Sequence, residues 1–337
     1  MRKGAVVPTE TFPAPLPPGL VARRLDLDAD RDAVLDVVRA YDARYVQRPQ
    51  QTPEEIVSDL ASSGADLARD AWLVVSGERA VGLGWFTVED PDPQHPVLWF
   101  DVYADPALPA DAALEASLVE AMLARCRDEA ADGGADEVTV ESGCLRGDER
   151  TDAALRAAGF EHERTFWRME RGLTPAPPEP GNPPAGVTVR AAHDDAHDRA
   201  LLHRLFTETF AEHWGTVHRS EDEWWERLRG RAGFDPSQWW ISVVDGEPAA
   251  FLMADSSRAA DGGGYVPLLG VRETARGRGV AKHLLLLAFA EQARRGWGWS
   301  QLTVDTGNET GAPALYASVG MEPVEVIDLY RLVLPRG

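Results

Sequence analysis

The chain has 337 residues, of which 44% are hydrophobic and 26% charged, so it is long enough for two globular domains and too apolar to be disordered. Its formal net charge of −21 argues against nucleic acid or an anionic membrane as a partner, because phosphate contacts need clustered Lys and Arg. No run approaches the ~20 apolar residues of a membrane span, and the two cysteines, Cys126 and Cys144, are too few for a disulfide framework, which favours a cytoplasmic location.

Two segments are expected to lie outside the domains. Residues 1–19 begin with two basic residues but have no apolar run long enough for a signal peptide, so we expect a flexible leader. Residues 172–186 contain six prolines and three glycines. Because proline fixes φ and lacks an N–H donor, this segment is predicted to be a linker between one domain at residues 20–171 and another at 187–335.

The two predicted domains repeat each other in their order of elements. Residues 71–86 and 239–254 both look like β-hairpins that turn on Gly-Glu, and a glycine (Gly159 or Gly320) closes a short helix near the end of each half. Ser220 and Glu223 form a predicted capping box at the start of a helix. The order strand, two helices, strand meander, long helix, strand, short helix and terminal strand predicts an α+β fold, with a mixed, mostly antiparallel sheet flanked by helices in each domain.

A phosphate-binding loop is predicted in the second domain, between a strand at residues 265–271 and a helix that ends at Gly296. The first turn of a helix has N–H groups without internal partners and carries the positive end of the helix dipole. Glycines allow the backbone to approach an anion closely, and arginines add positive charge. The residues in these positions are Arg276, Gly277, Arg278, Gly279, Val280 and Ala281.

This loop resembles the acyl-CoA loop of the GNAT superfamily of N-acetyltransferases, which reads Arg or Gln, two variable residues, Gly, a variable residue, and Gly or Ala. Arg276, Gly279 and Ala281 occupy these positions here. The resemblance implies two tandem GNAT-like domains and acetyl-CoA as the acyl donor. A broken dinucleotide fingerprint fits less well, because its third glycine is replaced by Lys282 and the loop follows several strands. An ordinary Arg/Gly-rich turn is the other alternative.

The resemblance also implies roles for residues around the loop. Asn308 would contact the pantetheine arm of the cofactor, and Tyr316 would lie near the thioester sulfur. A phenol is protonated at neutral pH, so Tyr316 could act as the general acid for the leaving thiolate, the alternative being that it is merely packed. In this family the sheet splays apart at the cofactor strand, so the backbone groups of Leu269, Gly270 and Val271 would hold the acetyl carbonyl and the pantetheine amides.

The corresponding loop of the first domain lacks these features. When the two halves are aligned, Ala107 replaces Arg276, Pro109 removes an amide donor and Asp111 adds a negative charge. We therefore expect a degenerate N-terminal GNAT-like domain with a structural role, and a catalytic C-terminal domain.

The general base for the acceptor amine is open from the residues alone. Candidates are Glu208, Glu212, His213 and Asp305, and the position of the first two helices in GNAT-like domains favours Glu212 and His213. An acidic residue that the resemblance leads us to expect at the start of the cofactor strand is here Tyr265. The resemblance is therefore not extended to the identity of the acceptor.

Tryptophans are concentrated in the same region, mixed with acidic residues. They either form an aromatic, anionic pocket for a cationic amine or serve as core anchors. The histidines have no metal-ligand spacing, so no metal is expected. The tryptophans are Trp214, Trp224, Trp225, Trp239 and Trp240.

The sequence thus predicts an N-acetyltransferase that passes the acetyl group of acetyl-CoA directly to the amine of a small molecule, which could be cationic. One alternative is a different acyl donor or acceptor, and another is a non-catalytic acyl-CoA-binding sensor or interaction protein. A monomer is expected, since the repeat supplies an internal pseudo-dimer, with a homodimer as the alternative.

Overall fold

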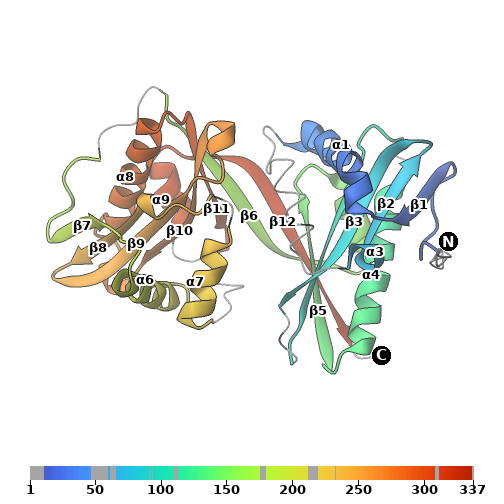
Figure 1. Ribbon diagram of the computed structural model, residues 1–337, viewed down its shortest axis with the longest axis horizontal. Coiled ribbons are helices and arrows are strands. Elements are labelled where there is room, and N and C mark those ends of the chain that lie inside the picture. Colours follow the sequence, from blue (N-terminus) through green and yellow to red (C-terminus); the bar gives the residue numbers. More distant parts are fainter. Residues whose placement is uncertain are drawn as a thin grey trace, which may run out of the picture. The chain divides into compact units, whose positions relative to one another are not determined.

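The computed structural model describes residues 11–46, 60, 66–90, 92, 94–109, 113–174, 180–211, 219–231, 233–307 and 311–335. The chain divides into two compact units. Unit 1 consists of Met1–Thr165 and Ile327–Gly337, and unit 2 of Phe166–Val326. Both units combine helices with a sheet in which antiparallel pairs outnumber parallel ones, so the predicted α+β class is confirmed (Figure 1).

In unit 1, the sheet separates two hydrophobic clusters, one packed on helix α1 and the other on helix α4. All neighbouring strands pair antiparallel except β4 and β5, which are parallel. The strands in spatial order are β1 (Leu20–Arg24), β2 (Ala71–Ser76), β3 (Arg79–Asp90), β4 (Val97–Ala104), β5 (Glu137–Leu145) and the second part of β12 (Glu322–Pro335). The helices are α1 (Leu27–Tyr45), α3 (Leu67–Asp70), α4 (Leu114–Asp132) and α5 (Glu149–Ala157).

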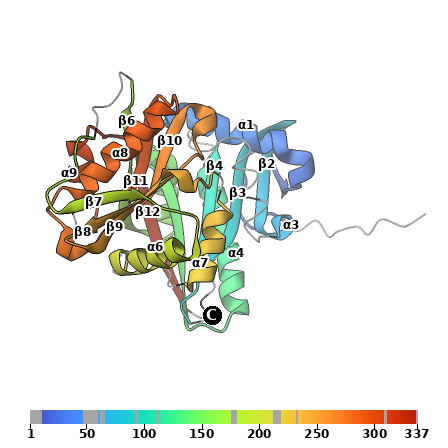
Figure 2. The same cartoon turned by 60° about the vertical axis from the view of Figure 1, so that its left-hand side comes forward.

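In unit 2, helices α8 and α9 cover one face of the sheet, and α6 and α7 cover the other (Figures 1 and 2). Among its described strands, only the β10–β11 pair is parallel. The strands in spatial order are β6 (Glu161–Gly172, in this unit from Phe166), β11 (Trp299–Asp305), β10 (Gly263–Val271), β9 (Glu247–Asp255), β8 (Trp239–Val244) and β7 (Val187–Ala191). The helices are α6 (Ala196–Thr209), α7 (Glu221–Arg229), α8 (Val280–Arg294) and α9 (Ala312–Ser318), with 3-10 turns at Pro236–Gln238, Ala259–Asp261 and Glu273–Ala275.

The two units exchange the terminal strands of the repeated halves. Strand β6 ends the first half, yet its residues 166–172 pair with β11 of unit 2. Strand β12 ends the second half, yet its residues 327–335 pair with β5 of unit 1. The boundaries of the compact units therefore do not coincide with the proline-rich segment 172–186. The alternating pattern of a sequence predicts that a strand exists, but its partner depends on contacts distant along the chain.

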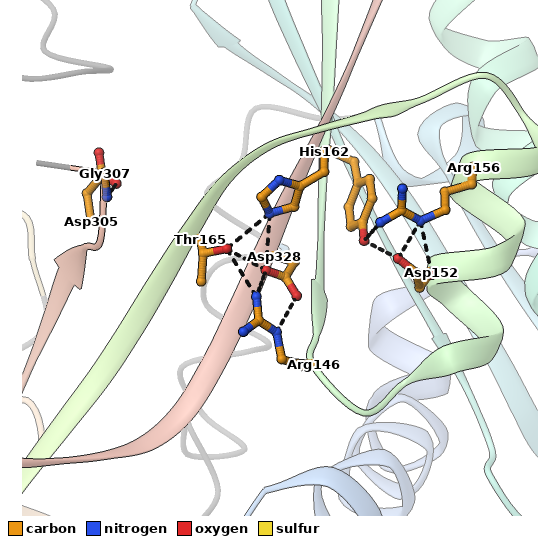
Figure 3. A network of polar contacts seen from close by, with 9 residues as sticks. Arg146, Asp152, Arg156, His162, Thr165, Asp305, Gly307 and Asp328 are labelled. Atoms are coloured by element: carbon orange, nitrogen blue, oxygen red, sulfur yellow. Dashed lines mark hydrogen bonds and ion pairs between the residues drawn. The ribbon is translucent and has the colours of Figure 1, made fainter.

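Asp328 anchors the exchanged strand β12 within unit 1. Its carboxylate accepts hydrogen bonds from Arg146 Nε and Nη2, at 2.9 and 2.6 Å, and from Thr165 Oγ1 at 2.6 Å, while His162 Nε2 lies 3.2 Å away (Figure 3). Asp328 is only 8% exposed, and this burial alone would raise its pKa. The bonds from Arg146 and Thr165 outweigh burial, so the pKa of Asp328 is lowered. The charged carboxylate therefore stabilises the folded unit.

The predicted flexible leader is only partly described, and its described part packs on the fold. Of the predicted flexible leader, residues 1–10 lie outside the described residues, whereas 11–19 pack on unit 1: the Phe12 ring meets Trp72 edge-on at 5.1 Å. The predicted capping box of Ser220 and Glu223 at the start of α7 is confirmed.

Within the described ranges, no helix is both long and apolar enough to cross a membrane.

Candidate active site

Strands β10 and β11 diverge after only three paired residues. Residues 263–265 pair in parallel with 299–301, and the pairing ends there, although β10 stays paired with β9 as far as Val271. A β-bulge between Tyr265 and Leu268 accompanies the divergence. From Val266 onward, the edge of β10 that faces β11 therefore has no strand partner, which is the splay that the GNAT resemblance implied.

A cavity of about 510 Å³ occupies the opening between these strands. Its walls come from both diverging strands, from the loop and first turn of α8, and from α9, α6 and β6. The cavity is thus a cleft that a ligand can enter between two strands of one sheet. The lining residues are Phe166, Thr209, Phe210, Val266, Pro267, Leu269, Gly270, Val271, Ala275, Arg276, Gly277, Gly279, Val280, Ala281, Lys282, Leu302, Thr303, Val304, Asp305, Ala312, Leu315 and Tyr316.

The first turn of α8 makes one end of this cavity suited to an anion. Gly279 is the N-cap residue with a φ of +79°, and Gly277 has a φ of +75°, a conformation that side chains disfavour. The N–H groups of the following turn have no helical acceptors and carry the positive end of the dipole. Arg276 and Lys282 add two cationic side chains to the same lining.

Gly270 is required by the close approach of helix α6 to strand β10. A Cβ atom at this position would lie 2.3 Å from Oγ1 of Thr209 and 2.5 Å from the ring of Phe251. Thr209 is fixed in turn, because its hydroxyl donates to the carbonyl of Leu205 at 2.7 Å. A side chain at residue 270 would therefore push α6 away from the cavity wall.

Tyr316 reaches the cavity from α9. It is half-buried, and desolvation raises the pKa of its phenol to about 12, with a smaller contribution from nearby Tyr265. The hydroxyl is therefore protonated throughout the physiological range and can donate a proton or a hydrogen bond into the cavity.

Arg171, on the exchanged strand β6, holds the end of the helix that carries Tyr316. Its guanidinium donates to the carbonyl of Val319, directly after α9, and lies over the ring of Phe289 with its Cζ 5.2 Å from the ring centroid. A cation at a helix C-terminus satisfies a carbonyl and opposes the helix dipole. Arg171 therefore fixes the position of α9 relative to the sheet.

Most of the predicted cofactor-binding residues surround this one cavity. Arg278 does not line it: its guanidinium pairs with Asp245 and donates to the carbonyl of Ala185 at 3.3 Å. Asn308, Glu212 and His213 lie outside the described residues. The predicted residues that do line the cavity are Leu269, Gly270, Val271, Arg276, Gly277, Gly279, Val280, Ala281 and Tyr316.

The other two candidate bases are placed differently. Glu208 pairs with Nε of Arg272 at 2.5 Å, which ties the end of α6 to the start of the α8 loop. Asp305 lines the cavity at the end of β11, and its carboxylate accepts the amide N–H of Gly307 at 2.8 Å (Figure 3). Of these two carboxylates, Asp305 lines the cavity and Glu208 does not.

Three of the five predicted pocket tryptophans fill the core instead of forming a pocket. Of the other two, Trp214 lies outside the described residues, and Trp240 is partly buried against the cluster packed on α8. Trp224, Trp225 and Trp239 are each at most 6% exposed and pack with α6 residues in one hydrophobic cluster. The core alternative therefore holds for these three residues. No cluster of potential metal ligands occurs within the ranges that the structure describes.

Several lining residues were not predicted. Lys282 directly follows the glycine-rich motif, so its charge was visible in the sequence. Thr209 and Phe210 end the first helix of the second half, and only tertiary packing reveals their contact with the cavity. Phe166 belongs to the exchanged strand, and no local signal in the sequence assigns it to this site.

Comparison with known proteins shows which proteins this chain is similar to. Residues 199–321 match the model of the acetyltransferase (GNAT) family. A GCN5-related N-acetyltransferase from Sphaerobacter thermophilus superposes with a TM-score of 0.81 at 25% identity, covering 96% of this chain and 98% of the other. A tandem GNAT protein from the clavulanic acid biosynthesis pathway superposes with a TM-score of 0.66 at 18% identity, covering 93% and 98%. The predicted fold of two tandem GNAT-like domains is thereby confirmed.

The curated relatives are more specific in name. The chain is 32% identical to a mycothiol acetyltransferase of Thermobispora bispora over 192 residues, which cover 53% of this chain and 61% of the relative. A mycothiol acetyltransferase of Nocardioides sp. is 31% identical over 201 residues, covering 52% and 63%. The chain thus spans about three fifths of the length of these relatives.

Proposed function

We propose that this protein is an N-acetyltransferase that transfers the acetyl group of acetyl-CoA directly to an amine of a small molecule. One observation carries the proposal: the cavity between β10 and β11 ends at the glycine-rich N-terminus of α8. This arrangement offers an anion site and a strand edge with unpaired backbone groups in one continuous space. The match of residues 199–321 to the GNAT family model supports the same reaction.

The residues of the cavity suit the parts of coenzyme A. The first-turn N–H groups of α8, together with Arg276 and Lys282, would hold the diphosphate. The unpaired edge of β10 from Leu269 to Val271 would hydrogen-bond the pantetheine amides in the manner of an added strand. A volume of about 510 Å³ falls within the range of small-molecule sites. The role of Asn308 in this contact remains part of the proposal.

We assign to the residues of this chain the proton transfers and the charge stabilisation that accompany cleavage of a thioester. Tyr316 would donate its proton to the departing thiolate, since its raised pKa keeps it in the acid form. A backbone N–H of the β10 edge, aimed at the thioester carbonyl oxygen, would stabilise the negative charge that develops there. Glu212 and His213 stay as predicted candidates for activating the amine.

The remaining parts of the proposal concern context. We assign catalysis to the C-terminal half and a structural role to the degenerate N-terminal half, whose strand β6 contributes Phe166 to the cavity wall. A cytoplasmic location is supported by Cys126 and Cys144, which are both buried and free of disulfides. Because the curated relatives are named mycothiol acetyltransferases, the acceptor of those enzymes is one compound to include in the test. The name alone does not establish it as the substrate of this protein.

A calorimetric titration combined with a thiol-release assay tests the proposal. The protein should bind acetyl-CoA, and at least one compound in a panel of polar primary amines should accelerate the release of free coenzyme A. An absence of acetyl-CoA binding contradicts the assignment altogether. Binding without amine-dependent release supports the alternative of an acyl-CoA sensor.

A further inference from the structure

The end of the proline-rich segment runs alongside the loop and helix turn proposed to bind the diphosphate. Pro184 lies against Gly279, because a Cβ atom built on that glycine would be 3.5 Å from Cγ of the proline. One turn further along α8, the ring of His283, which is 6% exposed, donates a hydrogen bond to the carbonyl of Pro180. Residues 180–184 therefore contact both ends of the first turn of α8.

Arg278, the residue before the N-cap of α8, is held by two partners outside the cavity. Its guanidinium pairs with Asp245, in the turn between β8 and β9, and Nη2 lies 3.2 Å from Oδ1. The same nitrogen donates to the carbonyl of Ala185 at 3.3 Å. A Cβ atom at Gly186 would lie 2.6 Å from Oδ1 of Asp245 and 2.9 Å from Nη2 of Arg278, so these three residues meet at one point. Residues 180–186 together with Asp245 are here named the linker clamp.

The loop that the linker clamp holds has little rigidity of its own. Arg278 stands between Gly277 and Gly279, whose φ values are +75° and +79°. Glycine loses more conformational freedom on folding than any other residue, so a loop with two of them is costly to order. The side chain of Arg278 provides an anchor between these glycines. The prolines of residues 180–184 stiffen the segment to which it is anchored.

We propose that the linker clamp positions the cofactor loop, with Asp245 and Arg278 as positioning residues that keep the amides of the first turn of α8 directed at the diphosphate. This inference rests on the proposed function and adds a role for the segment that joins the two repeated halves. Arg278 acts on the cofactor through the backbone that it holds, and its guanidinium does not bind a phosphate group. A loop that is ordered before binding loses less conformational entropy when the cofactor binds, so the linker clamp raises the affinity.

A different use of the same residues makes the opposite prediction. If Arg278 left Asp245 to bind a phosphate group directly, Asp245 would compete with the cofactor, and removal of its charge would raise the affinity for acetyl-CoA. If the linker clamp positions the loop, removal of that charge lowers the affinity. The described contacts favour the linker clamp, because Arg278 is engaged by a carboxylate and a carbonyl at once and does not line the cavity.

Calorimetric titration of acetyl-CoA into the full chain and its Asp245→Asn variant tests the sign of this effect. Asp245 has a φ of +52°, which asparagine also tolerates, so the substitution removes the charge and keeps the turn. The dissociation constant should rise about three- to fivefold, on the scale of a solvent-exposed ion pair. In a thiol-release assay, KM for acetyl-CoA should rise by a similar factor with kcat unchanged, because the loop binds the donor without taking part in the chemical step.

Two further variants separate the ion pair from general electrostatics. Glu247→Gln removes the same charge two residues later, at an exposed position at the start of β9, and should bind acetyl-CoA as the wild type does. In an Arg278→Gln background, Asp245→Asn should have no additional effect, because Asp245 acts through Arg278.

Hydrogen exchange measures the same coupling from the side of the linker clamp. Because coupling between two sites is reciprocal, a clamp that favours acetyl-CoA binding must itself be stabilised by acetyl-CoA. The amides of Val187 and Asp245 donate to the carbonyls of Pro184 and Gly186. Both amides should exchange about three- to fivefold more slowly when acetyl-CoA is bound to the wild type.

The inference is overturned if Asp245→Asn binds acetyl-CoA as tightly as Glu247→Gln does, or more tightly. It is also overturned if acetyl-CoA leaves the exchange of both amides unchanged, or if Asp245→Asn only unfolds more easily, since the contacts would then be structural. If the wild type binds no acetyl-CoA, the proposed function itself has failed, which is a separate result.

Discussion

Both units open their sheet at the same place, yet among the described residues it is unit 2 that shows a cavity lined by a glycine-rich helix start. In unit 1, β4 and β5 pair through residues 97–99 and 139–141, just as β10 and β11 pair through 263–265 and 299–301. Three parallel pairs precede the divergence in each case. The fold therefore provides the opening twice, and the side chains decide whether it can hold a ligand.

In unit 1, the described residues of the corresponding loop have internal partners. Arg150 pairs with Glu115 at 2.9 Å and donates to the carbonyl of Leu108 at 3.2 Å, which ties α5 to the loop before α4. The amide of Ala107 donates to a carboxylate oxygen of Asp105 at 2.8 Å. An amide N–H that donates inside the loop is not offered to a phosphate group.

The unit 1 residue at the position of Tyr316 also lacks a group that the proposed reaction needs. Leu155 stands at this place in the aligned halves and is fully buried in the core of unit 1. An apolar side chain there stabilises the fold and can donate no proton. We therefore expect binding and catalysis to depend on a few positions at the open end of the sheet, and each can be compared with a substitution in unit 1.

The largest effect is expected from Gly279→Asp at the N-cap of α8. The residue has a φ of +79°, and an aspartate there would place a negative charge where we expect the diphosphate. Affinity for acetyl-CoA should fall by at least about 100-fold, equivalent to about 2.7 kcal/mol, in a calorimetric titration. Ala107→Asp puts the same charge on the unit 1 loop and should leave the affinity unchanged. If both substitutions lowered the affinity for acetyl-CoA equally, the proposed difference in ligand binding between the two units would be wrong.

A smaller effect is expected from Tyr316→Phe. Loss of the phenolic proton should lower kcat by about 10- to 100-fold, and acetyl-CoA affinity should stay within about twofold, because the ring remains. Since the pKa of Tyr316 is raised to about 12, ionisation of this group should cause no loss of wild-type activity between pH 7 and 10. Tyr330→Phe, in unit 1, removes a buried hydroxyl of the same kind and should not change kcat. A kcat that is equal in Tyr316→Phe and wild type would exclude the phenol as the acid.

Arg171→Ala tests whether the exchanged strand supports catalysis in unit 2. The variant loses the bond to the carbonyl of Val319 and the contact with Phe289, so α9 and Tyr316 should become less well positioned. We expect kcat to fall about 5- to 10-fold with little change in acetyl-CoA affinity, as measured by thiol release at saturating amine. Arg171→Lys should recover part of the rate, because it restores a cation at the helix end. A pure loss of stability with normal kcat would reduce Arg171 to a structural role.

The sequence predicts the site well where its signals are local. Gly277, Gly279 and the helix that follows them stand in one continuous stretch, so the anion-binding loop follows from spacing and backbone geometry alone. The hairpin turns and glycine caps are recognisable for the same reason: Gly159 and Gly320 both have positive φ after a short helix. Each of these features needs only residues that are close together along the chain.

Features that depend on distant residues were not predictable. Phe166 and Arg171 reach the cavity region only because β6 pairs with β11, more than 125 residues later in the chain. The sequence allowed the tryptophans near acidic residues to form either a ligand pocket or part of the core. The burial of Trp224, Trp225 and Trp239 in the structure shows that these three belong to the core.

An effect on stability alone, with none on activity, is expected at the other exchanged strand, through Asp328→Asn in unit 1. The substitution replaces a charged acceptor of the Arg146 and Thr165 bonds by a neutral one, so the free energy of unfolding should drop by about 1–2 kcal/mol at pH 7. The pKa of Asp328 is lowered in the folded state, so its contribution is present above the unfolded pKa of about 4 and is lost as the pH falls through the folded pKa. Urea unfolding should therefore give a constant difference from wild type above pH 5 and a shrinking one below pH 4. Asp132→Asn, an exposed change in the same unit, should show no such dependence, and acetyl-CoA affinity should be unaltered in both variants. A difference that persists undiminished at low pH would mean that the charge of Asp328 does not hold the exchanged strand.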